Sequence, residues 1–161
     1  MILIECNNDY AFYHLLCPNY RKRDFRHFNK PELIKKLHAD ESGRIIGLCD
    51  EDDPRSNRMP FLDEFELIEN LTDMGVKIFR HRRNNSKHLI MVTPRLEEWI
   101  YHRARVCKVD PDSYRLPRDP EVLKNRFKVD SDPRFQGFLQ EVIDRDQNLA
   151  RLRVLIQQKY N

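Results

Sequence analysis

The chain has 161 residues, which suits one domain with a sizeable core. Hydrophobic residues make up 40% of it and charged residues 34%, and apolar side chains recur along its whole length, so the composition excludes a disordered chain. No apolar run reaches the roughly 20 residues that a membrane-spanning helix needs, and the opening residues lack the basic start of a signal peptide. The four cysteines show no C-x-x-C spacing, which is typical of reduced thiols rather than of zinc ligands. We therefore expect a cytoplasmic protein that does not associate with membranes.

The charge is distributed unevenly, although its net value is only +3. Residues 40–73 hold eleven Asp and Glu against three Lys and Arg, whereas residues 76–108 hold nine Lys and Arg against two Glu. Such polarisation indicates one surface that holds cations and another that attracts a polyanion. The alternative is two solvated faces of different charge.

The first half of the chain alternates short apolar runs with amphipathic segments. A helix is expected to begin near Asp9, as its N-cap or in its first turn, and to end before Pro18. We further expect strands at residues 2–4, 24–28 and 44–49, and helices at residues 31–40 and 60–74, the last with a stripe of Phe61, Phe65, Ile68 and Leu71. Alternating strands and helices predict a mostly parallel sheet.

The second half begins with two more apolar runs and then becomes helical. Strands are expected at residues 76–82 and 88–93, paired antiparallel at the sheet edge through a turn at Asn84–Asn85. Helices are expected at residues 95–107, 120–127 and 134–160. The predicted fold is therefore an α/β domain over residues 1–108, its sheet flanked by helices. A helical C-terminal extension over residues 109–161 packs on it as part of a single compact unit.

Acidic residues close two of the predicted strands. Glu5 ends the first strand, and Asp50 with Asp52 ends the strand at 44–49. Parallel strands end at the same edge of a sheet, where ligands collect, so we expect these carboxylates to meet. Crowded like charges destabilise a fold, and a hard cation with oxygen ligands relieves that conflict, so a Mg²⁺ (or Mn²⁺) site is predicted. Asp9 is a further direct or outer ligand. The alternative is a helix cap at Asp9 and a solvated acidic turn after the strand.

These acidic strand ends carry a family resemblance. The segments I-L-I-E-C-N-N-D at positions 2–9 and I-I-G-L-C-D-E-D at positions 45–52 resemble the Toprim domain of topoisomerases, primases and overcoming-lysogenization-defect-type nucleases. In that family a strand ending in Glu is followed by a strand ending in Asp-x-Asp. The resemblance covers about the first half of the chain. It implies a Toprim-like fold in which Glu5, Asp50 and Asp52 bind Mg²⁺.

A second segment is similar to a narrower group. T-P-R-L-E-E-W-I at positions 93–100 looks like the Pro-x-Leu-Glu-x-Trp segment of small standalone Toprim-like proteins, some of them associated with bacterial (antiviral) defence. The resemblance makes Glu97 the best candidate for an additional catalytic acid. The alternative is an ordinary carboxylate in a first helical turn, where the helix dipole favours negative charge.

The Toprim resemblance implies phosphodiester chemistry. Topoisomerases and primases need further machinery that 161 residues do not accommodate, which leaves a metal-dependent endonuclease acting on DNA or RNA. Its metal would neutralise phosphate charge and lower the pKa of an attacking water. Basic side chains near the last two predicted strands are candidates for binding the nucleic-acid backbone: Lys77, Arg80, Arg82, Arg83 and Lys87. Lys87 is also a candidate for stabilising charge that develops in the reaction.

Two other functions compete with the nuclease. The first is a non-catalytic Toprim-like docking or sensing module, because related standalone proteins commonly act beside an ATPase partner. A homo-oligomer is the other expected assembly. The second is a receiver-like signalling domain. Receivers place an acidic pair after their first strand, whereas the pair here follows the third predicted strand, which disfavours that reading.

Overall fold

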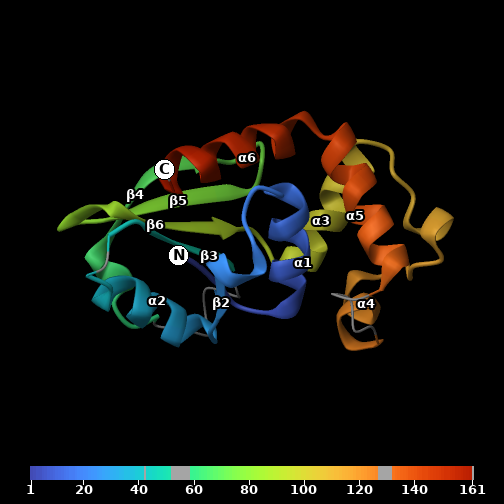
Figure 1. Ribbon diagram of the computed structural model, residues 1–161. Coiled ribbons are helices and arrows are strands. Elements are labelled where there is room, and N and C mark those ends of the chain that lie inside the picture. Colours follow the sequence, from blue (N-terminus) through green and yellow to red (C-terminus); the bar gives the residue numbers. More distant parts are fainter. Residues whose placement is uncertain (42, 52–58, 127–131, 161) are drawn as a thin grey trace.

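The computed structural model describes residues 1–41, 43–51, 59–126 and 132–160, and its centre is a six-stranded sheet with helices on both faces (Figure 1). The strands are β1 (Ile2–Ile4), β2 (Phe25–His27), β3 (Ile45–Asp50), β4 (Phe65–Leu71), β5 (Val76–His81) and β6 (Asn84–Val92). The α-helices are α1 (Asn7–Leu16), α2 (Lys30–Ala39), α3 (Leu96–Val106), α4 (Pro120–Arg126), α5 (Pro133–Arg145) and α6 (Gln147–Tyr160). The described residues also form the 3₁₀ helices η1 (Lys22–Asp24), η2 (Leu62–Glu64) and η3 (Pro111–Tyr114). The predicted α/β class is confirmed.

The sheet order is β2-β1-β3-β6-β5-β4. β2, β1, β3 and β6 are parallel, whereas β5 and β4 are antiparallel to their neighbours. The parallel strands therefore end at one edge of the sheet, where Asp50 of β3 lies opposite Val92 of β6. We call this edge the carboxyl edge.

Each parallel strand contributes side chains to both faces of the sheet, as alternation along a strand requires. Leu3 of β1 packs with α2 on one face. Ile2 and Ile4 pack on the opposite face, in the larger core that α1, α3, α5 and α6 cover. β1 and β3 are short apolar runs because both of their faces are buried. None of the helices in the described residues combines the length and apolar character needed to cross a membrane.

The prediction of a helix over residues 60–74 is wrong, because η2 and β4 occupy this segment. A β-bulge between Leu67 and Glu69 makes Ile68 an extra residue in the strand. The bulge breaks the alternation of apolar residues, so their spacing imitates a helical stripe. Phe65 packs on the α2 face, whereas Ile68 and Leu71 pack on the opposite face.

Two further boundaries differ from the sequence-based expectation. The hairpin turn expected at Asn84–Asn85 lies at residues 82–83, and β4 rather than this hairpin forms the sheet edge. The single helix expected over 134–160 is interrupted at Asp146, whose backbone is extended. Its carboxylate accepts hydrogen bonds from Arg103 of α3 and from the backbone N–H of Asn148. Asp146 therefore ends α5 and caps α6. The remaining expected strands and helices agree with the described elements to within a few residues.

Helix α2 approaches β3 closely at Gly47. A Cβ atom added there would lie 2.8 Å from Cδ2 of Leu33 and 3.1 Å from Cδ2 of Leu37, both on α2. A contact of 2.8 Å is too short for a close-packed core, so the side chain of Leu33 would have to shift. Gly47 therefore lets α2 pack closely against β3.

Replacing Gly47 by alanine should lower the free energy of unfolding by about 1–3 kcal/mol, because the added methyl group overpacks the interface between α2 and β3. Urea denaturation measures this change. Leu67→Ala on the exposed face of β4 is the control and should stay within about 0.5 kcal/mol of the unmodified chain. Equal stability of both variants would contradict the close approach.

Candidate functional site

Two of the predicted metal ligands meet at the carboxyl edge. Glu5 directly follows β1, Asp50 is the last residue of β3, and Lys30 is the first residue of α2. The ammonium of Lys30 lies 2.9 Å from Oδ1 of Asp50 and 3.5 Å from Oε2 of Glu5. Lys30 is only 3% exposed. A single buried positive charge therefore bridges carboxylates that come from two neighbouring strands.

The N-terminus of α3 holds the other oxygen of Asp50. The backbone N–H of Leu96, the first residue of α3, donates to Oδ2 of Asp50 at 3.2 Å. The next residue, Glu97, is buried and accepts a hydrogen bond of 2.7 Å from the amide of Asn8 in α1. Glu97 is thus held against α1 by Asn8, one residue after the N–H group that binds Asp50.

Asp9 lies near Glu5 and Asp50, and only 2% of the residue is exposed. Its carboxylate accepts the backbone N–H groups of Glu5 (3.0 Å) and Cys6 (2.7 Å), so it closes the first turn of α1. Burial raises the pKa of Asp9 to about 8, and the negative charges of Glu5 and Asp50 add to the effect. Near neutral pH this carboxyl group therefore retains its proton in much of the population. We call Glu5, Asp9 and Asp50 the carboxylate cluster.

Two residues of this edge were missed by the sequence analysis. Lys30 lies one residue before the predicted helix over 31–40 and was given no role, yet a cation at a helix start opposes the helix dipole, which is a signal of a nearby anion. Glu51 lies next to Asp50 and accepts hydrogen bonds from Lys77 (2.8 Å) and from Oγ1 of Thr93 (2.6 Å). Although burial acts in the opposite direction, these donors hold the pKa of Glu51 below its ordinary value. The predicted third ligand, Asp52, lies outside the described residues.

The five basic side chains predicted to bind nucleic acid do not form one strip. Lys77 lies near the carboxyl edge and pairs with Glu51. The others lie farther along β5 and β6 or in the turn between them: Arg80 binds the carboxylate of Glu66, Arg82 binds the carbonyl of Asp63, Arg83 lies 3.7 Å from the carboxylate of Glu64, and Lys87 donates to the carbonyl of His38.

The structure does not bring Lys87 to the carboxylate cluster. Lys87 pairs with Ile45 at the beginning of β3, five residues before Asp50, and it is buried. It therefore caps the C-terminal end of α2 instead of contacting a reacting group at the carboxyl edge. Of the predicted basic residues, Lys77 is the one beside that edge.

The carboxylate cluster offers oxygen donors from two strands, but Glu5, Asp9 and Asp50 do not bring three ligand atoms within 4.8 Å of one another. Glu5 and Asp50 both reach one ammonium group, so a cation between them meets oxygen atoms from two strands. Oxygen donors suit Mg²⁺ or Mn²⁺. The ammonium of Lys30 competes for the same oxygens, and any bound ion must displace it from them.

The chain matches no protein-family model, no curated protein sequence and no solved structure. The Toprim resemblance therefore stays a prediction that rests on the quoted segments.

Lys30→Met should lower the free energy of unfolding by about 3 kcal/mol in EDTA, because Glu5 and Asp50 lose their buried counter-charge. This value is near the low end of the range for a broken buried ion pair, because the side chain of Glu5 is still 27% exposed. Lys35→Met, on the exposed face of the same helix, is the matched control. A similar urea midpoint for the two variants would show that the bridge contributes little.

Asp9→Asn should remove a pH dependence of stability. The folded protein keeps the Asp9 proton up to about pH 8, whereas the unfolded chain loses it near the ordinary value of 3.8. The folded state binds more protons between these values, so the free energy of unfolding should fall as the pH rises from about 4 to about 8. Denaturation curves across this range measure the slope. Asp24→Asn is the control, because Asp24 accepts a similar backbone hydrogen bond at an exposed position. Parallel profiles for Asp9→Asn and the unmodified protein would contradict the shifted pKa.

Proposed function

We propose that this protein is a Toprim-like nuclease that needs Mg²⁺ or Mn²⁺ to cleave phosphodiester bonds of DNA or RNA. Its proposed metal ligands are Glu5, Asp50 and Asp52, with Asp9 as a further ligand and Glu97 as an additional catalytic acid. The observation that carries the proposal is the bridge from Lys30 to Glu5 and Asp50, because a cationic group already sits between acids from two strands.

The ion supplies charge neutralisation and an activated water. Lys30 has a further part in this proposal. If Glu5 and Asp50 held the ion, the ammonium of Lys30 would be released from them and could donate to a phosphate oxygen at the carboxyl edge. Glu97 is suited to accept a proton from water, because Asn8 fixes its carboxylate. Lys77 extends the positive charge along the edge, so it is the best candidate for contact with the nucleic-acid backbone.

A non-catalytic docking module is the competing proposal, and the same bridge gives it support. Lys30 neutralises the carboxylate cluster without an ion, which is what a purely structural role requires. In this reading the carboxyl edge contacts an ATPase partner or a second copy of the chain. The two proposals differ in one property, which is whether a divalent ion can displace Lys30.

A cleavage assay tests the nuclease. The purified chain is incubated with plasmid DNA and with structured RNA, in Mg²⁺, Mn²⁺ or EDTA. We expect cleavage only with metal, and we expect Asp50→Asn to reduce the rate by more than the roughly 10–100-fold that loss of an outer-shell partner costs. Glu41→Gln, an exposed acid outside the cluster, is the matched control and should leave the rate unchanged.

Cleavage that persists in EDTA or in Asp50→Asn would reject the site. Calorimetric titration with Mg²⁺ then separates the two proposals if no cleavage is seen. Binding that is lost in Asp50→Asn, without cleavage, favours a metal-loaded docking module. Absence of both binding and cleavage favours the lysine-neutralised module.

A further inference from the structure

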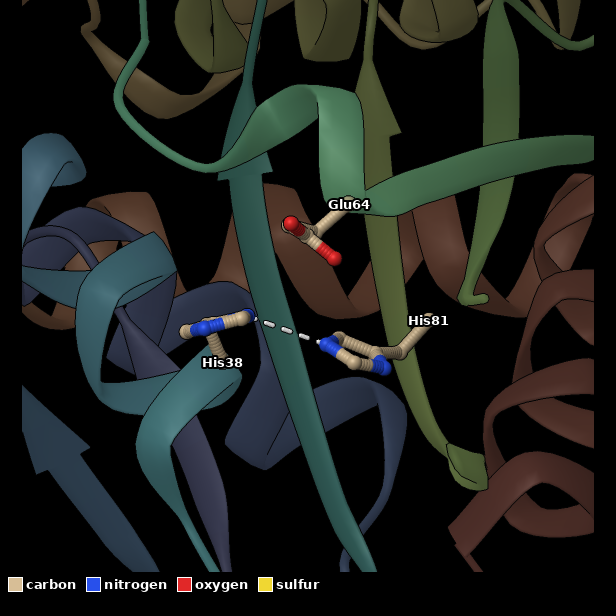
Figure 2. Close-up of side chains that lie close together, drawn as sticks. All are labelled: His38, Glu64 and His81. Carbon is tan, nitrogen blue, oxygen red and sulfur yellow. Dashed lines mark hydrogen bonds between the residues drawn. The ribbon is translucent and has the colours of Figure 1, made fainter. Parts of the chain in front are cut away.

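A second cluster of ligand-type side chains lies at the opposite edge of the sheet. His38 is in the last turn of α2, Glu64 is in η2 directly before β4, and His81 ends β5. One ligand atom from each of these residues lies within 4.8 Å of the other two. Figure 2 shows an oxygen of Glu64 directed toward the space between the two imidazole rings. We call this group the histidine cluster. Because β6 begins beside His81, it is separated from the carboxyl edge by the length of the central strands.

The two rings are already spaced almost as ligands of one ion. Nδ1 of His38 lies 3.0 Å from Nε2 of His81. Two nitrogens bound to a tetrahedral zinc ion at about 2.0–2.1 Å lie roughly 3.3 Å apart, so the rings need to separate by only a few tenths of an ångström. Glu64 is partly exposed, which leaves its carboxylate room to approach.

Neighbouring aromatic rings hold both imidazoles in place. Phe61 stacks on His38 with ring centroids 4.7 Å apart, and Phe65 meets His81 edge-on at 5.0 Å. Burial, together with the charge of Lys87, lowers the pKa of His81, which favours the neutral ring that metals bind. The ligand geometry is therefore supported by packing from two sides.

We infer that His38, Glu64 and His81 form a binding site for a nitrogen-preferring transition ion, Zn²⁺ in the first instance, with water as the fourth ligand. Two neutral imidazoles and one carboxylate are a donor set that zinc accepts. Mg²⁺ and Ca²⁺ depend on several oxygen ligands, and the nearby charges of Lys87 and Arg83 oppose a cation held by one carboxylate alone. The bound ion ties the end of α2 to the start of β4 and the end of β5.

Binding requires the ring proton of His81 to change position. The backbone N–H of Arg83 donates to Nδ1 of His81 at 3.1 Å, so the neutral ring carries its proton on Nε2 and donates it to Nδ1 of His38. When Nε2 binds zinc, this proton moves to Nδ1 and no net proton is released. The N–H of Arg83 then loses its acceptor and turns to water, which the exposed hairpin turn allows. The amide of Arg83 is therefore a specific reporter of the bound ion.

Zinc titration of the metal-free full chain, followed by calorimetry and by ¹⁵N amide spectra, tests the inference. We expect one equivalent of Zn²⁺ to bind, with the Arg83 amide among the most shifted signals. His38→Gln and Glu64→Gln should each raise the zinc Kd by at least about tenfold, because each removes a ligand. His102→Gln, which changes an exposed histidine on α3, is the control and should keep the Kd.

Three results would overturn the site: no zinc binding by the folded chain, an unchanged Kd in both ligand variants, or an unmoved Arg83 amide at saturation. The amide spectra also report whether each variant is folded. Loss of zinc binding in Glu5→Gln instead of Glu64→Gln would assign the ion to the carboxylate cluster. Because this test does not involve cleavage, its outcome is independent of the nuclease proposal.

Discussion

The buried ammonium of Lys30 holds Glu5 and Asp50 together at the carboxyl edge. A buried lysine is tolerated only when anions compensate it, and buried carboxylates have the same need. Glu5 and Asp50 meet that need for Lys30, and Lys30 meets it for them. This pairing also constrains the backbone. Lys30 is the first residue of α2, so its ammonium reaches Asp50 only if the helix begins near the end of β3. Gly47 has no side chain at the point where the helix crosses the strand, and so permits that placement.

The meeting of Glu5 and Asp50 followed from strand polarity and could be predicted from sequence. Parallel strands that each end in an acid place those acids at one edge, whatever the details of packing. The lysine could not be predicted with the same rule. Its position before Pro31 indicates a helix start, and nothing local indicates the direction of its side chain. The burial of Asp9 could not be predicted either, because an acid that caps a helix is more often exposed.

Errors in the fold prediction explain why the histidine cluster was not found. The β-bulge gave β4 the apolar spacing of a helix, so the sequence analysis did not place Glu64 beside the end of β5. His38 and His81 are 43 residues apart in the sequence, so their pairing is visible only in the folded chain. The basic residues are separated for a related reason. Alternation along β5 places Lys77 and Arg80 on different faces of the sheet, and Lys87 lies at the end of β6 opposite the carboxyl edge.

The ion pair between Arg103 and Asp146 ties the last two helices to the rest of the molecule. Both side chains are buried, and Asp146 also supplies the cap that starts α6. Phe135 and Phe138 of α5 belong to the same core as β1 and α1. A fragment cut at residue 108 would strand the guanidinium in apolar surroundings and uncover that core. The boundary after residue 108 is therefore not a point at which the protein can be divided. The N-terminal part, which carries Glu5 and Asp50, needs the C-terminal helices to keep its core covered.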